Sequence, residues 1–416
     1  MLKANRQSTS GKLASTFLLA LAVMFSHSAD AQSYAVLHNF TGGADGGNPY
    51  SGLTMDGGGN LYGTTFGGGS GNGTVYKMTH RNGSWTLATL YQFAGGNDGS
   101  SPYAGVTFGP NGSLYGTTTV GGSHGDGTVF NLTPASHICS HTSCSWTETV
   151  LHTFQGGADG ANPDGGVSFD QAGNLYGTTT VGGDHCANGC GTVYELSPSG
   201  SGWRGGVIYD FSNLNGDGAT PVSGVILDNA GNLYGTTLNG GDFSYGAAYE
   251  LTYSPGLLEW TESFVHSFGD NDFSFPYAGL IFDPLGNLYG AAPTATNDGG
   301  GGVFELMPSD GSWTYSPVYQ LGGAGTSCGP RASLVMDSEG SLYGTTYCDG
   351  AYGQGSVFKL THINGNWTFT TLYSFTGHSD GEYPLSNVVI DADGNLYGTT
   401  QYGGPHGAGV VWEITP

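Results

Sequence analysis

The chain is poor in charge, above all in positive charge. Charged residues make up 10% of its 416 residues, whereas an ordinary soluble domain has about 25%. Only 8 side chains are Lys or Arg against 32 Asp or Glu, a formal net charge of -24. A protein that binds nucleic acid needs basic surface to neutralise phosphates, so the composition excludes nucleic acid as a partner. We interpret the acidity as a source of solubility rather than as a means of capturing cations.

Long apolar runs are also missing. No segment approaches the roughly 20 apolar residues that a membrane-spanning helix requires. The most apolar run, residues 13–25, follows three basic residues and precedes an A-x-A cleavage pattern, Ala29-Asp30-Ala31. This arrangement predicts a signal peptide over residues 1–31 and a mature protein of residues 32–416. We therefore expect a protein without a membrane span, secreted to the extracellular space or the periplasm.

Motifs that would indicate a reaction are scarce. We identify no Gly-x-Ser-x-Gly nucleophile elbow, no His-Glu-x-x-His and no phosphate loop with its lysine. Helical periodicity is absent from the mature chain as well. The sequence therefore gives no ground for naming a chemical step.

Cysteine is infrequent, and its six copies lie in local pairs. The pairs are Cys139 with Cys144, Cys186 with Cys190, and Cys328 with Cys348. Local pairs suit an oxidising compartment, and they predict three disulfides that tie down glycine-rich loops. Zinc is the alternative, because histidines lie nearby at 137, 141 and 185, but no C-x-x-C pair supports it.

The chain is rich in glycine, with 78 copies, and in one repeated triplet, Leu-Tyr-Gly. Each tyrosine of the triplet lies 13 residues after a proline. The tyrosines are Tyr62, Tyr115, Tyr176, Tyr234, Tyr289, Tyr343 and Tyr397. Successive tyrosines are 53, 61, 58, 55, 54 and 54 residues apart. This period matches the length of a four-stranded propeller blade.

One repeat, residues 102–154, contains four short runs with the composition of strands: YAGVTF, SLYGTTT, GTVFNLT and SWTETVLHTF. Turns rich in Asn, Asp and Gly separate the first two runs in nearly every copy. Seven such units cannot each form a core, so they must bury their faces on one another. We predict an all-β fold, a single seven-bladed propeller with four antiparallel strands per blade. A β-helix is the alternative, disfavoured by its shorter period.

The last repeat ends after its third strand, and the missing strand is found at the other end of the chain. Residues 33–40 align with the fourth-strand runs of the other repeats. We therefore predict that strand 33–40 pairs with the last blade and closes the ring, which removes an exposed edge.

The pattern GL-x-x-D-x-x-GNLYGTT-x-x-GG, as in Gly52 to Gly69, resembles the choice-of-anchor tandem-repeat GloVer family. The resemblance covers essentially the whole mature chain. It implies an exported β-propeller-like repeat protein without an established activity. Members carry varied C-terminal anchors, and since nothing follows Pro416 here, the expectation is release rather than tethering.

Positions that are identical in all repeats are best explained by blade geometry. We therefore assign the Leu-Tyr-Gly tyrosines to packing between blades rather than to an aromatic platform for sugars. The residue after each proline varies instead, and on the innermost strand it would surround the axial channel. These residues are Tyr50, Tyr103, Asp164, Val222, Tyr277, Arg331 and Leu385. We predict ligand binding by Tyr50, Tyr103, Asp164, Tyr277 and Arg331 of this set.

The loops that reach the same face carry acids and histidines. The outer-to-inner connections contain Asp45, Asp98, Asp159, Asp217, Asp272 and Asp380. His378 and Asp380 join the predicted site because, with Glu382, they could supply acid and base groups. We predict no cofactor, with calcium as an alternative that these carboxylates would allow. Asp-Gly is also an ordinary turn signal.

Three functions remain open on the sequence alone. The first is a monomeric secreted propeller that binds an extracellular glycan or a protein partner through its loop face. The second is a propeller lyase or hydrolase with an axial site. Its side chains would be Asp164, Arg331, His378 and Asp380, and they would have to converge. The third is a purely structural matrix protein.

Overall fold

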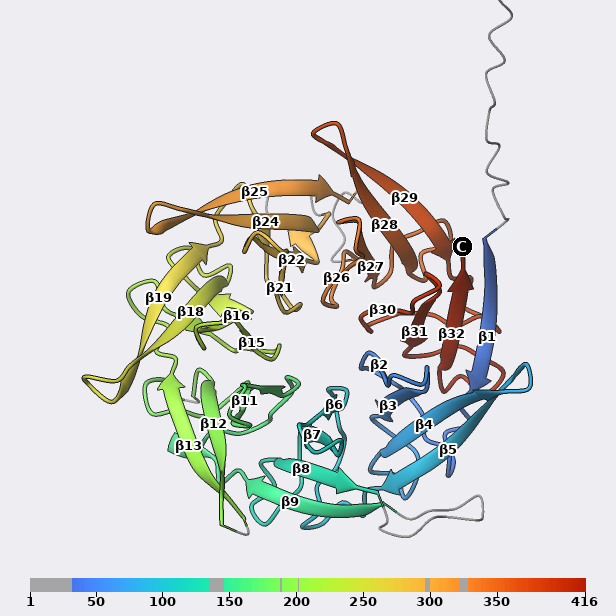
Figure 1. The fold of residues 1–416 in the computed structure, drawn as a ribbon, viewed down its shortest axis with the longest axis horizontal. Coiled ribbons are helices and arrows are strands. Elements are labelled where there is room, and N and C mark those ends of the chain that lie inside the picture. Colours follow the sequence, from blue (N-terminus) through green and yellow to red (C-terminus); the bar gives the residue numbers. More distant parts are fainter. Residues whose placement is uncertain (1–31, 135–145, 188, 201, 296–299, 322–327) are drawn as a thin grey trace, which may run out of the picture.

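The computed structural model describes residues 32–134, 146–187, 189–200, 202–295, 300–321 and 328–416. The predicted signal peptide, residues 1–31, lies outside the described residues. The described chain forms seven four-stranded antiparallel sheets arranged as blades around a central axis (Figure 1). The prediction of a seven-bladed propeller is confirmed.

Each of the first six blades is continuous in sequence, with its strands in order from the axis outward. Blade 1 contains β2 (Thr54–Met55), β3 (Leu61–Thr65), β4 (Thr74–Arg81) and β5 (Ser84–Gln92). Blade 2 contains β6 (Thr107–Phe108), β7 (Leu114–Thr118), β8 (Thr128–Thr133) and β9 (Thr147–Thr153). Blade 3 contains β10 (Ser168–Phe169), β11 (Leu175–Thr179), β12 (Thr192–Ser199) and β13 (Gly202–Asp210).

The following blades repeat this order. Blade 4 contains β15 (Ile226–Leu227), β16 (Leu233–Thr237), β18 (Ala247–Ser254) and β19 (Glu259–Ser267). Blade 5 contains β21 (Ile281–Phe282), β22 (Leu288–Ala292), β24 (Gly302–Ser309) and β25 (Ser312–Gln320). Blade 6 contains β26 (Val335–Met336), β27 (Leu342–Thr346), β28 (Ser356–Ile363) and β29 (Asn366–Ser374). Minor elements are the pairs β14 (Gly218–Ala219) with β17 (Asn239–Gly240) and β20 (Phe273–Ser274) with β23 (Thr294–Ala295), and the 3-10 turn η1 (Gly157–Asp159).

Blade 7 joins the two ends of the chain. It contains β30 (Val389–Ile390), β31 (Leu396–Thr400), β32 (Val410–Thr415) and, as its outer strand, β1 (Ser33–Asn39). β1 lies antiparallel to β32, with Ser33 opposite Thr415 and Asn39 opposite Val410 (Figure 1). The predicted closure by strand 33–40 is therefore confirmed.

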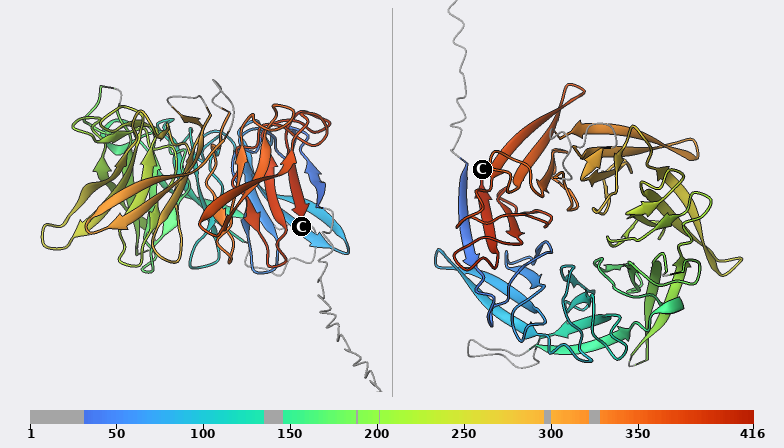
Figure 2. Two further views of the ribbon diagram at one scale, coloured as in Figure 1. Left: turned by 90° about the horizontal axis from the view of Figure 1, so that it is seen from above. Right: turned by 180° about the vertical axis from the view of Figure 1, so that it is seen from behind.

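The innermost strands are shorter than the sequence suggests. The runs after the prolines, such as YAGVTF, pair over only two residues, here Thr107 and Phe108. The residues between each proline and its strand instead follow the wall of the channel. The side view shows a disc with loops on both faces (Figure 2, left).

The Leu-Tyr-Gly strand is buried on both faces because each sheet lies between two neighbouring blades. In blade 1, Tyr62 and Val75 pack against Leu114 and Phe130 of blade 2. Tyr62 is 4% exposed, and its ring lies edge-on to Phe108 of the next blade. The assignment of the tyrosine row to packing between blades is confirmed.

The glycine of the triplet makes room for the strand beside it. A Cβ atom on Gly63 would lie 2.5 Å from the hydroxyl of Tyr76 on β4. The same relationship holds in blade 7, where a Cβ on Gly398 would lie 2.3 Å from the Trp412 ring. Glycine is thus required wherever the third strand carries a large aromatic side chain.

Threonine hydroxyls connect adjacent blades near the axis. Thr64 of blade 1 donates a hydrogen bond to the carbonyl of Ala104 in blade 2, at 2.8 Å. Thr399 donates to the carbonyl of Ser51 at 3.0 Å and so links blade 7 to blade 1. Blade 5 has Ala291 at this position, and there the N–H of Gly279 donates to the Ser333 hydroxyl of blade 6, at 3.0 Å. The threonine row therefore links neighbouring blades around the ring.

Two of the three predicted disulfides lie in described segments, and both are formed: Cys186 with Cys190 and Cys328 with Cys348. The third pair, Cys139 with Cys144, lies outside the described residues. Disulfides persist in oxidising compartments, so these two indicate a location outside the cytoplasm. Within the described segments, no helix is long and apolar enough to cross a membrane.

Candidate functional site at the mouth of the axial channel

One end of the channel opens into a cavity of about 200 Å³. The residue after the proline of each blade contributes one side chain to its wall. The lining residues are Tyr50, Tyr103, Asp164, Val222, Tyr277, Arg331 and Leu385. This is the ring that the repeat alignment placed around the channel. The proline in each blade brings the following residue to the same position on the axis, and the side chains then differ from blade to blade.

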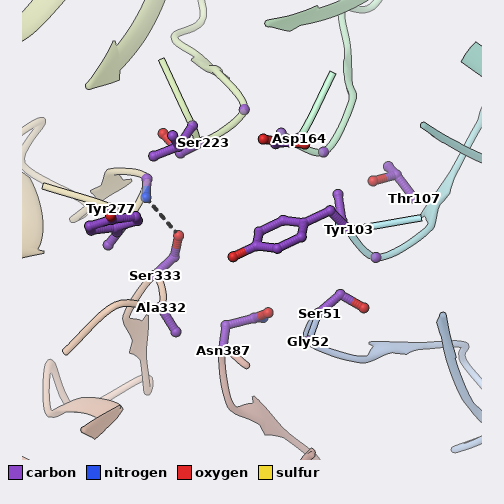
Figure 3. Close-up of a pocket in the computed structure, with 18 of the residues that line it drawn as sticks. Ser51, Gly52, Tyr103, Thr107, Asp164, Ser223, Tyr277, Ala332, Ser333 and Asn387 are labelled. Carbon is purple, nitrogen blue, oxygen red and sulfur yellow. Dashed lines mark hydrogen bonds between the residues drawn. The ribbon is translucent and has the colours of Figure 1, made fainter. Parts of the chain in front are cut away.

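Below this mouth, a wider cavity of about 450 Å³ continues between the inner strands. Small and polar side chains line it, among them Ser51, Thr107, Ser223, Ser333 and Asn387 (Figure 3). Apolar side chains such as Leu53, Val106 and Leu280 line it as well. The channel wall therefore offers both polar and apolar surface.

Tyr103 projects from blade 2 into the channel, and its hydroxyl points toward the wall that carries Tyr277 and Ser333 (Figure 3). Burial and the nearby carboxyl of Asp164 raise the pKa of Tyr103 to about 12. The phenol therefore keeps its proton at neutral pH and is a hydrogen-bond donor.

Asp164 lies beside Tyr103 on the innermost segment of blade 3. Its Oδ1 accepts a hydrogen bond from the Thr119 hydroxyl at 2.8 Å. Burial raises the pKa of Asp164 above its usual range, although hydrogen bonds from Thr119 and Thr180 oppose the rise. Among the described residues that line the two cavities, Asp164 is the single carboxyl group.

Arg331 supplies the positive charge of the mouth. Its guanidinium carbon lies 5.2 Å from the ring centroid of Tyr277 and 4.2 Å from that of Tyr347. Tyr347 in turn stacks on Tyr383, with ring centroids 4.9 Å apart. The Cys328–Cys348 disulfide joins the segments that carry Arg331 and Tyr347. A covalent link therefore holds these two segments together at the mouth.

Tyr50 completes the aromatic part of the wall. Its ring lies 4.9 Å from that of Tyr103 and 5.1 Å from that of Phe66, centroid to centroid. The amide of Gln401 donates to its hydroxyl at 2.5 Å. Burial raises the pKa of Tyr50 to about 12, so this phenol is also protonated at neutral pH.

His378 and Asp380 belong to a different part of the fold. Asp380 accepts hydrogen bonds from the Tyr373 hydroxyl at 2.9 Å and from the backbone and hydroxyl of Thr376 at 2.9 and 2.6 Å. His378 is exposed, and neither residue is among those that line the cavities. The four side chains proposed for an enzyme therefore do not converge, because only Asp164 and Arg331 reach the axis.

The other loop aspartates share the role of Asp380. Asp45 accepts from the N–H of Thr41, four residues earlier, at 3.0 Å, and its Oδ2 lies 3.1 Å from His38 Nε2. Asp272 contacts His266 and the N–H of Gly269 in the same way, at 2.9 and 2.8 Å. The carboxylates thus close their own loops. Within the described part of the chain, no three His, Cys, Asp or Glu side chains are grouped for a metal ion, and calcium stays a prediction without a candidate site.

Three segments, residues 121–125, 325–329 and 377–381, match Gly-x-Ser-x-Gly by letter, so the expectation that this pattern is absent is wrong. The second segment lies mostly outside the described residues. The first and third are loop segments between strands of these blades, whereas the elbow places its serine between a strand and a helix. Neither of these two segments is a nucleophile elbow.

Sequence reasoning missed a second row of residues next to this ring, those immediately before the prolines. In six blades this residue has a positive φ although it is not glycine: Asn48, Ser101, Asn162, Thr220, Phe275 and Tyr383. The same internal alignment could have identified them, because they also vary while their neighbours are constant. The residue after the Thr-Thr pair, Tyr347 in blade 6, also varies between repeats. Sequence reasoning missed this position as well.

The repeats of this chain match a known family. The sequence model of the Gloeobacter/Verrucomicrobia repeat matches residues 20–148, 138–315 and 259–416. The chain belongs to this repeat family. The membership confirms the resemblance to the GloVer family that the repeated pattern suggested. No curated protein matches the chain.

Solved structures share the general shape of this member of the Gloeobacter/Verrucomicrobia repeat family. A protein from a Thermus species, assigned as an oxidoreductase (glucose dehydrogenase), is 15% identical, with a TM-score of 0.43, over 92% of this chain and 99% of its own. A protein assigned as a gluconolactonase is 12% identical, with a TM-score of 0.42, over 93% and 92%. A protein of unknown function from Dyadobacter fermentans DSM 18053 is 11% identical, with a TM-score of 0.46, over 92% and 98%. Similarity at this level carries no argument about function.

Proposed function

We propose that the protein is exported and binds a neutral glycan at the mouth of its axial channel. The observation that carries the proposal is the composition of the mouth: three tyrosines, one aspartate and one arginine around a cavity of about 200 Å³. At ~30 Å³ per water molecule, this is roughly seven water volumes, room for about one sugar unit. Aromatic rings can cover the apolar face of a sugar. Carboxylate and guanidinium groups offer paired hydrogen bonds to neighbouring hydroxyls.

Charge favours a neutral ligand over an ionic one. The net charge of -24 repels polyanions at long range. An organic cation would need the aromatic faces, but Arg331 already lies over the rings of Tyr277 and Tyr347. Sugar hydroxyls can form hydrogen bonds with both Asp164 and Arg331. A neutral sugar is not repelled by the net charge, and it does not compete with Arg331 as a cation for the aromatic rings.

The side chains of the mouth favour binding over catalysis. Glycoside hydrolysis generally uses two carboxyl groups across the scissile bond, whereas the described lining residues offer Asp164 alone. A lyase needs a base, but a phenol with a pKa of about 12, as in Tyr103, holds its proton at neutral pH.

Calorimetry and a glycan array test the proposal on the full-length chain, purified as the expression host processes it. We expect binding to at least one class of neutral oligosaccharide. Tyr103→Ala and Asp164→Asn should each weaken it tenfold or more. Tyr253→Ala is the matched control, since Tyr253 is 41% exposed on β18, lies with its ring tilted against Trp260 and lines neither cavity. Absence of binding to every neutral glycan, or equal loss in the control, would reject the proposal.

Export has its own test. Cleavage after Ala31 would leave β1, which begins at Ser33, complete for pairing with β32. The purified protein should therefore begin at Gln32 by N-terminal sequencing. A mature chain that began inside β1 would contradict the proposed cleavage site.

A further inference from the structure

A second cavity, of about 280 Å³, lies beside the axial mouth over the junction of blades 4, 5 and 6. It is lined by Leu238, Asn239, Phe275, Tyr277, Pro293, Thr294 and Arg331. Tyr277 and Arg331 also line the axial mouth. The two cavities therefore share a wall, and a ligand that filled both would contact these two side chains from both sides.

The chemistry of this second cavity resembles that of the first. Phe275, Pro293 and Leu238 provide apolar surface, while Asn239, Thr294 and Arg331 provide polar groups. The polar groups are held in place by the loops: Thr294 donates to the carbonyl of Ser274 at 2.9 Å. A mostly apolar concave surface with a few fixed polar groups is the usual form of a small-ligand site.

Phe275 is held in a backbone conformation that suits its position but not its residue type. Its φ is 58°, a region that bulky residues rarely adopt. Two other blades place asparagine there, Asn48 and Asn162, and asparagine tolerates this conformation well. The N–H of Phe275 donates to the carbonyl of Tyr245 at 2.8 Å, and its ring stays partly exposed at the cavity. A strained aromatic residue on a cavity wall points to a role for the ring.

We infer that the two cavities are adjacent subsites for one neutral glycan chain of at least two sugar units, an inference that rests on the proposed function. One unit occupies the axial mouth between Tyr103, Asp164 and Arg331. The next unit lies across Tyr277 and Arg331 on the ring of Phe275. Tyr103 projects into the channel (Figure 3), and we place the end of the glycan chain beside it.

The test is a calorimetric titration of the full-length protein with neutral glucose oligomers of one to five units, in α-1,4, β-1,3 and β-1,4 linkage. We expect the affinity to rise at least tenfold from one unit to two in the preferred linkage and to change little beyond three. Equal affinity for one and two units would overturn the inference while leaving the proposed function in place. Absence of binding to these oligomers at any length, together with absence of binding to every neutral glycan on the array, would overturn both.

Phe275→Asn is the decisive variant. It removes the ring but introduces the residue that blades 1 and 3 use at this position, where Asn48 and Asn162 donate to the Gln401 and Thr119 carbonyls at 3.2 and 3.0 Å. The variant should therefore fold at least as stably as the wild type. We expect it to bind two units no better than one, with unchanged affinity for the single unit.

Two controls complete the design. Ser101→Asn makes a comparable replacement before the proline of blade 2, at φ 57°, away from the second cavity. Phe243→Ala removes a phenylalanine that is 56% exposed on a loop of blade 4 and lines neither cavity. Both should keep the gain from the second unit. Retention of that gain in Phe275→Asn, or its loss in either control, would contradict the two-subsite arrangement.

Discussion

The guanidinium carbon of Arg331 lies 4.2 Å from the ring centroid of Tyr347. These two residues come from different loops of blade 6, and the Cys328–Cys348 disulfide connects the loops. Backbone bonds support the same junction, since the N–H of Tyr347 donates to the carbonyl of Gly329 at 3.2 Å. The cation at the mouth is therefore positioned by a covalent link, an aromatic face and a backbone pairing together.

Replacing Arg331 by lysine should weaken glycan binding about tenfold. Lysine keeps the charge but loses the planar fork that makes paired hydrogen bonds and stacks on Tyr277 and Tyr347. The cation–π contribution to folding is about 0.5–1 kcal/mol at exposed sites, so the free energy of unfolding should change little. Calorimetric titration measures the first effect and thermal unfolding the second. Unchanged affinity would show that the guanidinium does not contact the ligand.

The two described disulfides should differ in their effect on binding. Replacing Cys328 and Cys348 by serine opens a link across a sequence separation of 20, which the chain-entropy model values at about 3 kcal/mol. It also releases the loops of Arg331 and Tyr347. We expect both Tm and glycan affinity to fall.

Cys186→Ser with Cys190→Ser is the matched control for this experiment. That disulfide spans a separation of 4 in blade 3, worth about 2 kcal/mol on the same model. It lines neither cavity. Its removal should lower Tm without changing affinity. Equal loss of affinity in both pairs would mean that the effect is one of general stability.

Stability should fall as the pH rises from about 5 to 8. Burial, with the nearby Asp98 and Asp217 carboxylates, raises the pKa of Glu148 and of Glu262 from 4.5 to about 7. Between these values the folded chain holds protons that the unfolded chain has lost. The free energy of unfolding therefore decreases with increasing pH across this interval. Replacing both glutamates by glutamine should flatten the decline in Tm.

Glu339→Gln is the control for this pH series, because Glu339 is exposed. It should leave the slope of Tm against pH as in the wild type. Below about pH 4 the opposite trend should appear. Internal hydrogen bonds lower the pKa of Asp45, Asp56 and Asp380, and their stabilising contribution is lost as these groups gain protons. A Tm that rose steadily from pH 5 to 8 would contradict the assignment.

Gly63→Ala should destabilise the protein by about 1–3 kcal/mol, the usual cost of overpacking a core. The new Cβ would lie 2.5 Å from the Tyr76 hydroxyl and 3.1 Å from Leu53. Gly256→Ala makes the same chemical change at an exposed turn, where a Cβ meets nothing within 4 Å. Differential scanning calorimetry of both variants decides the matter. Equal Tm values would show that blade 1 can relax around the added methyl group.

The architecture could be predicted from the sequence because seven copies of one unit repeat the same constraints. The proline and the tyrosine of the repeat, Pro102 and Tyr115 in blade 2, have equivalents at the same spacing in every blade, so they indicate the fold directly. The variable residue after each proline indicates the channel mouth, and Tyr103 and Asp164 were predicted there for this reason. The residues that line the site could be predicted wherever the proline fixes the direction of the chain.

Loop side chains could not be placed by the same reasoning. The sequence indicates that Asp380 lies in a loop on the mouth face, but not that its carboxylate turns back to Thr376. Nor does it indicate that Phe275 adopts a positive φ that presents its ring to a cavity. These orientations depend on local backbone geometry, and the repeat pattern specifies only which loop a residue occupies.

The pairing of β1 with β32 can form only after the end of the chain has been synthesised. Ser33 and Thr415 lie opposite each other on adjacent strands of blade 7, although 382 positions separate them in the sequence. At a synthesis rate of about 5–20 residues per second, β1 emerges roughly 20 to 80 s before its partner exists. Until then, β1 and the growing last blade both present unpaired strand edges, which favour aggregation. A chain that ended before residue 410 would keep both edges unpaired. The yield of native protein therefore depends on how β1 is protected from aggregation until β32 has been synthesised.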